Sequence, residues 1–167
     1  AHEDRTKEII QEEFPDVFVS TSNEVVAQFR EYERFSTTAI NARIAPVMSS
    51  YLDRLQELLD DYGFEGADVL IMQSNGGVAS IREASQRPVT TLLSGPAAGV
   101  LSGQYTGKSS DEEKIITFDM GGTSADISVL PGRLLERDPR DSEIGEYPAI
   151  TPMLDIEAIG SGGGSIA

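Results

Sequence analysis

The sequence contains no cysteine and only one histidine, and both shortages exclude familiar kinds of chemistry. Without cysteine the chain has no disulfide, no thiolate nucleophile and no cysteine-ligated zinc, which is typical of a reducing compartment. The histidine, His2, stands at the beginning of the sequence, where chains are often poorly ordered, so a Ser-His-Asp triad is not expected. A cysteine mechanism is therefore excluded, and a serine hydrolase mechanism is disfavoured.

Long apolar runs are missing too, and positive charge is scarce. The longest apolar run, residues 69–72, is far shorter than the roughly 20 residues that span a bilayer, and the first residues lack the apolar stretch of a secretory signal. Lys and Arg number 13 against 28 Asp and Glu, so the net charge is -15, and no local basic patch offsets it. Because this charge repels a phosphate backbone, the protein is not expected to bind nucleic acid. The missing apolar runs predict a cytoplasmic protein that does not bind a membrane.

The chain does contain enough apolar material for a core. With 167 residues, 39% of them hydrophobic, it has the size of one domain or of two incomplete lobes. The acidic, polar stretch at residues 109–113 is the clearest break in the pattern. We therefore expect residues 1–108 to form the C-terminal part of a first lobe and residues 109–167 the N-terminal part of a second lobe.

Helical and extended patterns alternate along the chain, which indicates the α/β class. Apolar residues at steps of three and four predict helices over residues 5–14 and 47–62. Residues 37–45 are also expected to be helical, up to Pro46, which must kink or restart the helix. Shorter helices are expected over residues 22–29 and 97–105. Extended runs are predicted at residues 17–19, 69–74, 78–80, 89–93, 115–118 and 127–130.

The segment Phe118–Ile127 carries the strongest chemical signal. Its glycines let backbone N–H groups approach phosphate oxygens, and its threonine adds a hydroxyl donor. Asp119 ends the first strand, where it can hold a hydrated Mg²⁺ ion or orient water, and Asp126 can serve the metal or brace the turn. An ordinary β-hairpin is the alternative, but it does not account for two aspartates and a threonine. The predicted nucleotide-binding residues are Gly121, Gly122, Thr123 and Ser124, and the predicted catalytic residues are Asp119, also the metal ligand, and Asp126.

A second glycine string, Gly160–Ser165, follows the apolar run at residues 153–156. A flexible linker has the same composition, but the position between two apolar segments favours a loop between structured elements. The string is therefore either a linker or a second loop at the nucleotide, with Gly162, Gly163 and Gly164 as its candidate binding residues.

Other segments have an ordinary explanation beside a chemical one. Asp155 and Glu157 would share one side of a strand, as a metal or substrate pair or as solvated edge residues. The segment Asn75–Gly77 is a turn, ordinary or substrate-facing. Residues 103–109 imitate a nucleotide-binding Walker A loop, but they have three residues between the glycines instead of four and follow a helix. We interpret them as a helix end.

Six blocks together are more specific than any one loop. In chain order they are Arg30–Arg34, Ser36–Thr38, Gln73–Gly77, Leu93–Gly99, Thr117–Ser124, and Met153–Ile156 with the glycine string. In this order they resemble the central part of the hydantoinase A/5-oxoprolinase family, whose relatives include N-methylhydantoinase subunits and acetone carboxylase β subunits. The resemblance covers most of the chain.

The resemblance implies a partial actin-like ATPase fold of the ribonuclease H-like type, a mixed sheet with flanking helices, in which ATP and Mg²⁺ bind between two lobes. It implies that ATP activates a carbonyl or amide oxygen of a small cyclic substrate for ring opening or carboxylation, and it points to a hydantoinase B-type subunit as a partner. Family members are longer and carry another Asp-x-Gly-Gly-Thr loop. The chain is therefore expected to be an excised fragment that by itself binds ATP weakly or not at all and is inactive.

Two positions depart from the family pattern. Ala125 stands where members commonly have a second threonine, and Glu157 stands where many have histidine, which weakens the case for a metal or acid–base role there. Our expectation is a fragment of an ATP-dependent cyclic-amide hydrolase. The alternatives are an actin-like sugar kinase, in which Asp119 or Asp126 would act on a hydroxyl, and a non-catalytic nucleotide-binding scaffold.

Overall fold

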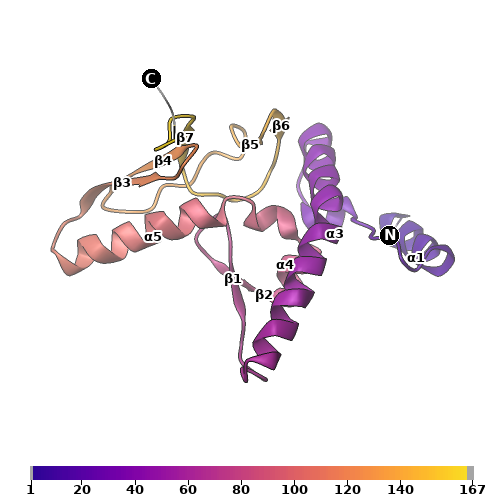
Figure 1. The fold of residues 1–167 in the computed structure, drawn as a ribbon. Coiled ribbons are helices and arrows are strands. Elements are labelled where there is room, and N and C mark those ends of the chain that lie inside the picture. The colour runs from indigo at the N-terminus through magenta and orange to yellow at the C-terminus, as the bar shows by residue number, and fades with distance from the viewer. Residues whose placement is uncertain (1, 165–167) are drawn as a thin grey trace. The chain divides into compact units, whose positions relative to one another are not determined.

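The computed structural model describes residues 2–164, and Figure 1 shows its helices and strands. The chain divides into two compact units, neither of which is one continuous stretch. The first unit contains the residues up to 71 together with residues 79–89 and 139–151. The second unit contains residues 72–78, residues 90–138 and those from 152 onwards. The predicted division into residues 1–108 and 109–167 stays a prediction.

The first unit is mainly helical. Its long helix α3 (Glu31–Asp61) carries the repeating apolar pattern and continues through Pro46, so the helix does not restart there. Proline removes one helix N–H, but the fully buried Ala45 and Leu52 anchor the helix on either side of it. The other elements are α1 (His2–Glu13), α2 (Ser22–Val25), α4 (Ile81–Gln86), and a hairpin of β5 (Glu143–Ile144) and β6 (Tyr147–Pro148).

Two buried polar side chains on α3 hold the first unit together. The amide of Asn41 donates to Ser20 Oγ at 2.9 Å and to the carbonyl of Gln86 at 3.1 Å, and its oxygen accepts the N–H of Val89 at 3.2 Å. The hydroxyl of Thr37 accepts the N–H of Ile150 at 2.8 Å. Because buried polar groups are costly unless paired, these bonds fix the segments around the core. That core consists of Val25, Val26, Val89 and Ile150, with Ile40, Ile44 and Ile144 packed against it.

Two expected extended runs are not formed in the described part of the chain, and these predictions were wrong. Residues 17–19 are irregular, and residues 88–91 form a 3₁₀ helix, η1 (Pro88–Thr91). β-Propensity reflects packing on a pleated sheet more than an intrinsic backbone preference, and neither segment pairs with a described strand. The β-branched Val89 instead joins the core of the first unit.

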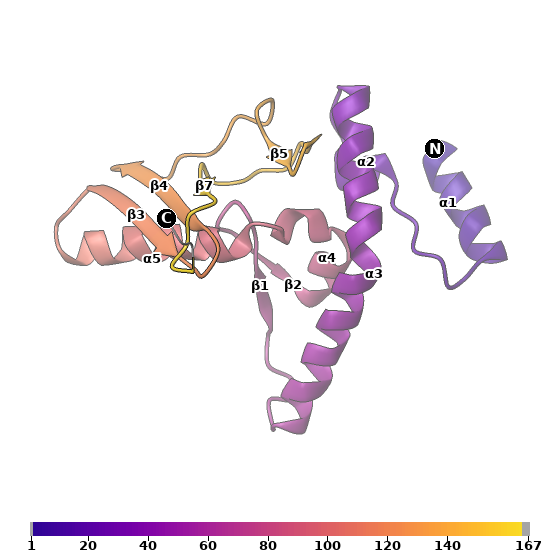
Figure 2. The ribbon, with the colours of Figure 1, turned by 45° about the horizontal axis from the view of Figure 1, so that its top comes forward.

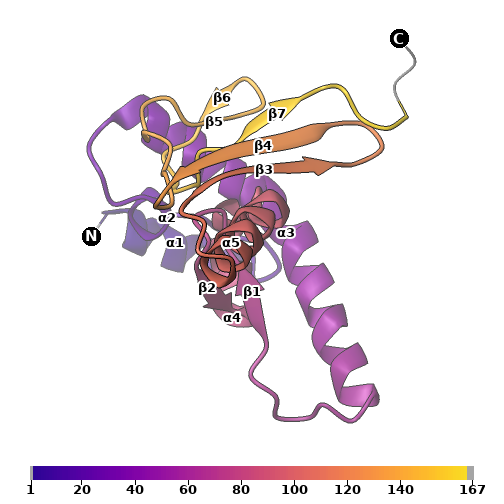
Figure 3. The same ribbon diagram turned by 90° about the vertical axis from the view of Figure 1, so that its left-hand side faces the viewer.

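The second unit is a small antiparallel sheet on a helix (Figures 2 and 3). Strands β3 (Lys114–Met120), β4 (Ala125–Pro131) and β7 (Glu157–Ile159) lie in the order β3-β4-β7, and helix α5 (Ser94–Ser109) packs against β3 and β4. Strands β1 (Leu70–Met72) and β2 (Val78–Ser80) form a separate two-stranded sheet, most of whose residues are counted in the first unit. The core of this unit is Ala97, Val100, Leu130, Leu154 and Ile156, with Ile115 and Leu134 packed against it.

Helix α5 approaches the sheet through glycines. A side chain added at Gly103 would collide with the side chain of Thr117, and one added at Gly107 would collide with Ile115. These glycines therefore serve helix–sheet packing, which agrees with the interpretation of residues 103–109 as helical. Across residues 2–164, no helix combines the length and the apolar character needed to cross a membrane.

Candidate functional site

The loop between β3 and β4 brings the two predicted aspartates together. The register places Asp119 directly opposite Asp126, and the ladder ends at Met120 and Ala125. The four residues Gly121–Ser124 connect the strands, and the N–H of Gly121 donates to the carbonyl of Ser124 at 2.9 Å. We call these four residues the hairpin loop. Asp119 is exposed and Asp126 is half-buried, so both carboxylates flank the loop within reach of solvent.

The second glycine string lies directly on the hairpin loop. Gly163 donates its N–H to the carbonyl of Gly121 at 2.9 Å, and Gly164 donates to the carbonyl of Gly122 at 2.8 Å. Gly162 is buried, and a Cβ there would lie 2.5 Å from the backbone nitrogen of Thr123. The string, whose described part is the glycine segment Gly160–Gly164, thus contacts the predicted phosphate loop, although no local pattern pairs the two. Ser165 lies outside the described residues.

A pocket of about 230 Å³ opens beside the two carboxylates. Pockets for drug-sized ligands usually measure about 300–1,000 Å³, so this one suits a phosphate group or a hydrated ion better than a whole nucleotide. A Cβ at Gly99, in the first turns of α5, would lie 3.7 Å from Asp119 Oδ2. The lining residues are Pro96, Gly99, Val100 and Ser102 from α5, Thr117, Phe118, Asp119 and Asp126 from the hairpin, and Ile156.

Sequence reasoning missed the contribution of α5 to this pocket. The segment Leu93–Gly99 supports the family resemblance but carries no predicted site residue. Its signal is a proline and several small residues at a helix start, where small side chains allow close approach to a neighbouring strand. The structure places Pro96 and Gly99 of this segment in the same pocket as Asp119.

The donors of the hairpin loop fit a phosphate. Within residues 2–164, the N–H groups of Gly122 and Thr123 and the Thr123 hydroxyl donate no hydrogen bond. A Cβ at Gly122 would meet no atom within 4 Å, so the backbone there is open to a ligand. Exposed backbone N–H groups of this kind bind anions. The tip of the hairpin therefore offers donors that the described chain does not use.

The two aspartates fit a magnesium ion that is shared with phosphates. Among residues 2–164, no three His, Asp or Glu side chains form a metal-binding cluster. Mg²⁺ does not need one, because it commonly takes one or two carboxylates together with phosphate oxygens and water. Asp119 and Asp126, paired across the strands, supply that number of carboxylates. A metal role for Asp119 stays a prediction.

The acidic pair Asp155 and Glu157 has a partner that sequence reasoning missed. Arg137 Nε donates to Asp155 Oδ1 at 3.3 Å, and Arg137 Nη2 donates to Glu157 Oε1 at 2.8 Å. The same Nη2 also donates to the carbonyl of Ile156 at 2.6 Å. The guanidinium therefore binds both carboxylates and the backbone between them, which is a structural role for the pair.

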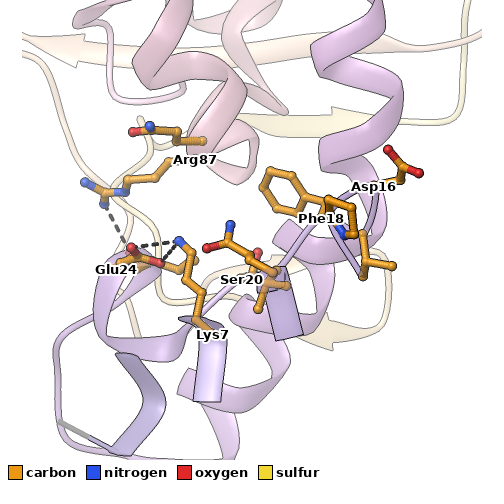
Figure 4. Close-up of a pocket in the computed structure, with 12 residues that line it drawn as sticks. Lys7, Asp16, Phe18, Ser20, Glu24 and Arg87 are labelled. Carbon is orange, nitrogen blue, oxygen red and sulfur yellow. Dashed lines mark hydrogen bonds and ion pairs between the residues drawn. The ribbon is translucent and has the colours of Figure 1, made fainter. Parts of the chain in front are cut away.

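A larger pocket, of about 610 Å³, lies in the first unit and contains none of the predicted site residues (Figure 4). Three of its four charged side chains, Lys7, Glu24 and Arg87, are already paired, and the fourth is Asp16. Lys7 Nζ binds Glu24 Oε2 at 2.7 Å, and Arg87 donates to the carbonyl of Val25 at 3.2 Å. The hydrogen bond from Lys7 holds the pKa of Glu24 below its ordinary value. Most of the charged groups in this pocket are therefore already used within the chain.

Comparison with solved structures establishes the class of the fold. The chain superposes on the crystal structure of ATP-dependent caprolactamase from Pseudomonas jessenii with a TM-score of 0.81 and 37% identity, over 99% of this chain and 24% of that one. It superposes on nucleotide-free acetone carboxylase with a TM-score of 0.82 and 24% identity, over 96% of this chain and 23% of that one. The prediction of a partial actin-like ATPase fold of the α/β class is confirmed.

Sequence comparison identifies the family. Residues 34–167 match the hydantoinase/oxoprolinase family, and the chain belongs to it. It is 38% identical to caprolactamase subunit alpha of Pseudomonas jessenii, over 100% of this chain and 24% of the relative. It is 35% identical to 5-oxoprolinase 1 of Arabidopsis thaliana, over 88% of this chain and 11% of the relative. The chain therefore spans about a quarter or less of the length of these curated relatives.

Proposed function

We propose that the chain forms one part of the nucleotide site of an ATP-dependent hydrolase that acts on cyclic amides. The observation that carries the proposal is the hairpin loop, where unused N–H groups of Gly122 and Thr123 stand beside two paired carboxylates in a family member. Two relatives support the substrate class, because they are a caprolactamase subunit and a 5-oxoprolinase. The caprolactamase of known structure is ATP-dependent, which supports the choice of nucleotide.

The proposal assigns a task to each predicted site residue. Gly122, Thr123 and Ser124 bind phosphate oxygens, whereas Gly121, which the sequence also predicted to bind them, closes the loop because the carbonyl of Ser124 accepts its N–H. Asp119 holds Mg²⁺ or orients water, and Asp126 supports it. Gly162, Gly163 and Gly164 belong to the same site. ATP, when bound, supplies the phosphoryl group that activates a carbonyl or amide oxygen of the substrate. The open N–H groups hold the phosphates in place, and fixed donors stabilise developing negative charge without reorganising during the reaction.

The proposal extends to the setting of the parent protein. Two relatives are named as subunits of larger enzymes. They are caprolactamase subunit alpha and the 30% identical acetophenone carboxylase gamma subunit. We therefore propose a second subunit of the hydantoinase B type as a partner and a cytoplasmic location. The carboxylase relative also favours a second candidate activity, the ATP-dependent carboxylation of a ketone.

Asp119→Ala in the full-length parent protein tests the assignment. Losing a preorganised charged group at the reacting phosphates should reduce ATP-coupled turnover by about 100-fold or more. Phosphate release is measured with a panel of cyclic amides, and with ketones plus bicarbonate, which separates the hydrolase from the carboxylase. Sugars in the same panel test the kinase alternative, and ATP binding without phosphate release would indicate the scaffold.

A matched control uses another exposed aspartate. Asp53 lies on the surface of α3, away from the hairpin in sequence, and Asp53→Ala should leave turnover unchanged. If Asp119→Ala retains full ATP-coupled turnover, the role given to the hairpin loop is wrong.

A further inference from the structure

The glycine segment contacts the hairpin loop through its backbone, and this contact sets the direction of the loop's peptide groups. The carbonyl of Gly121 accepts from Gly163, and the carbonyl of Gly122 accepts from Gly164. Both carbonyls therefore point toward the glycine segment. The N–H groups of Gly163 and Gly164 are used in these bonds, so they act on a ligand only through the loop.

The geometry of the peptide bond then fixes where the open donors point. The peptide bonds of the described chain are trans, and in a trans peptide the C=O and the following N–H point in opposite directions. Because the carbonyl of Gly121 faces the glycine segment, the N–H of Gly122 points away from it. The same holds for the carbonyl of Gly122 and the N–H of Thr123. Two successive N–H groups thus point to the same side, which is an anion-binding arrangement.

Close packing explains why the glycine segment needs glycine. A Cβ at Gly162 would lie 2.5 Å from the nitrogen and 2.6 Å from the carbonyl carbon of Thr123, and a Cβ at Gly164 would lie 2.8 Å from the oxygen of Gly122. A Cβ at Gly160 would meet no atom within 4 Å. Two glycines of one segment are therefore required by contact with the hairpin loop, whereas a third is not.

We infer that Gly162 and Gly164 are positioning residues that hold the hairpin loop so that the N–H groups of Gly122 and Thr123 face the phosphates of the bound nucleotide. This inference rests on the proposed function and adds to it. The glycine segment is a backing for the phosphate loop, and it contributes to nucleotide affinity without touching the nucleotide. A side chain at either position pushes the loop away and turns its donors.

Calorimetric titration of the full-length parent protein with Mg-ATP and with adenosine tests the inference. Gly162→Ala should weaken Mg-ATP binding by about 10-fold or more, the loss expected for one charge-assisted hydrogen bond. Adenosine affinity should stay the same, because it has no phosphate. In steady state, the KM for Mg-ATP should rise while the KM for the organic substrate does not, a split that a general loss of structure would not produce. Gly160→Ala is the matched control and should leave all these values unchanged.

Each outcome decides between the claims. If Gly162→Ala does not fold, Gly164→Ala carries the test, since its added Cβ meets a single carbonyl oxygen. If the wild-type protein binds Mg-ATP and the Gly162 variant binds it as tightly as the Gly160 variant does, the positioning role is wrong and the proposed function stands. An equal loss of adenosine and Mg-ATP affinity also refutes the positioning role. If the wild-type protein binds no Mg-ATP, the proposed function fails and the inference fails with it.

Discussion

Two glycine-containing turns of the second unit look alike in sequence and differ in structure. The turn at Gln73–Gly77 pairs three of its N–H groups within itself: Gly76 donates to the carbonyl of Gln73 at 3.0 Å, Gly77 donates to Asn75 Oδ1 at 2.9 Å, and Gln73 donates to the carbonyl of Gly77 at 2.8 Å. The hairpin loop, by contrast, leaves two successive N–H groups without an acceptor in the described chain.

The glycines of the two turns are needed for different reasons. Gly76 has a φ of 81°, in the left-handed region, and a Cβ there would lie 3.2 Å from Leu101 Cδ1. Gly122 has neither constraint, because its φ is not positive and a Cβ there would meet no atom within 4 Å. The fold therefore requires glycine in the first turn but not at Gly122. At Gly122 the absent side chain leaves the unused N–H groups of the loop open to a ligand that approaches the backbone.

Gly76→Ala should have the largest effect on the fold. A left-handed backbone costs a residue with a Cβ about 1–2 kcal/mol, and the contact with Leu101 adds to it, so local stability should fall by about 2 kcal/mol. Hydrogen exchange of residues 70–80 in the full-length protein measures the change. Gly76→Asn is the control and should lose less, because asparagine tolerates this conformation. Unchanged exchange in Gly76→Ala would contradict the contrast between the turns.

Gly122→Ala should show the opposite behaviour. Its Cβ enters open space, so exchange in the hairpin should not change, whereas Mg-ATP affinity should fall by about 10-fold, or about 1.4 kcal/mol. The affinity is measured by titration of the full-length protein. Gly76→Ala is the counterpart in this assay, and we expect it to bind Mg-ATP normally. If Gly122→Ala destabilises the hairpin as much as Gly76→Ala destabilises its turn, the distinction fails.

Asn75→Ala should have the smallest effect of the three. It removes the side-chain acceptor of the Gly77 N–H, and one such hydrogen bond contributes about 0.5–1.5 kcal/mol. Faster exchange confined to residues 73–78 is expected, with no change at the hairpin loop. Asn75→Asp keeps an oxygen acceptor in place and should restore most of the protection. Loss of nucleotide binding in Asn75→Ala would show that this turn faces a ligand after all.

Local patterns predicted the elements of the site but not their assembly. The run Ile115–Phe118 and the glycines after it indicated a strand and a turn, and both are present because they depend on near neighbours. The β-branched residues at Val17–Val19 and Val89 led to wrong strand predictions, because such residues form a strand only beside another strand.

Contacts between distant residues could not be read from the sequence. The bond from Gly163 to Gly121 joins residues about forty positions apart, and no local propensity specifies it. Arg137 was missed as the partner of Asp155 and Glu157 for the same reason. The family to which the six blocks pointed is confirmed, but the resemblance did not show that the glycine segment and the hairpin loop touch.

The interleaved course of the chain has a practical consequence for anyone who wants to shorten the protein. The backbone passes from one unit to the other after residues 71, 78, 89, 138 and 151. A single cut at any interior residue from 72 to 151 therefore leaves at least one unit in two pieces, and a cut at residue 109 separates α5 from the sheet on which it packs. A deletion should therefore remove all segments of one unit rather than only a terminus. In a split-protein design, the two fragments that together form a unit should be mixed.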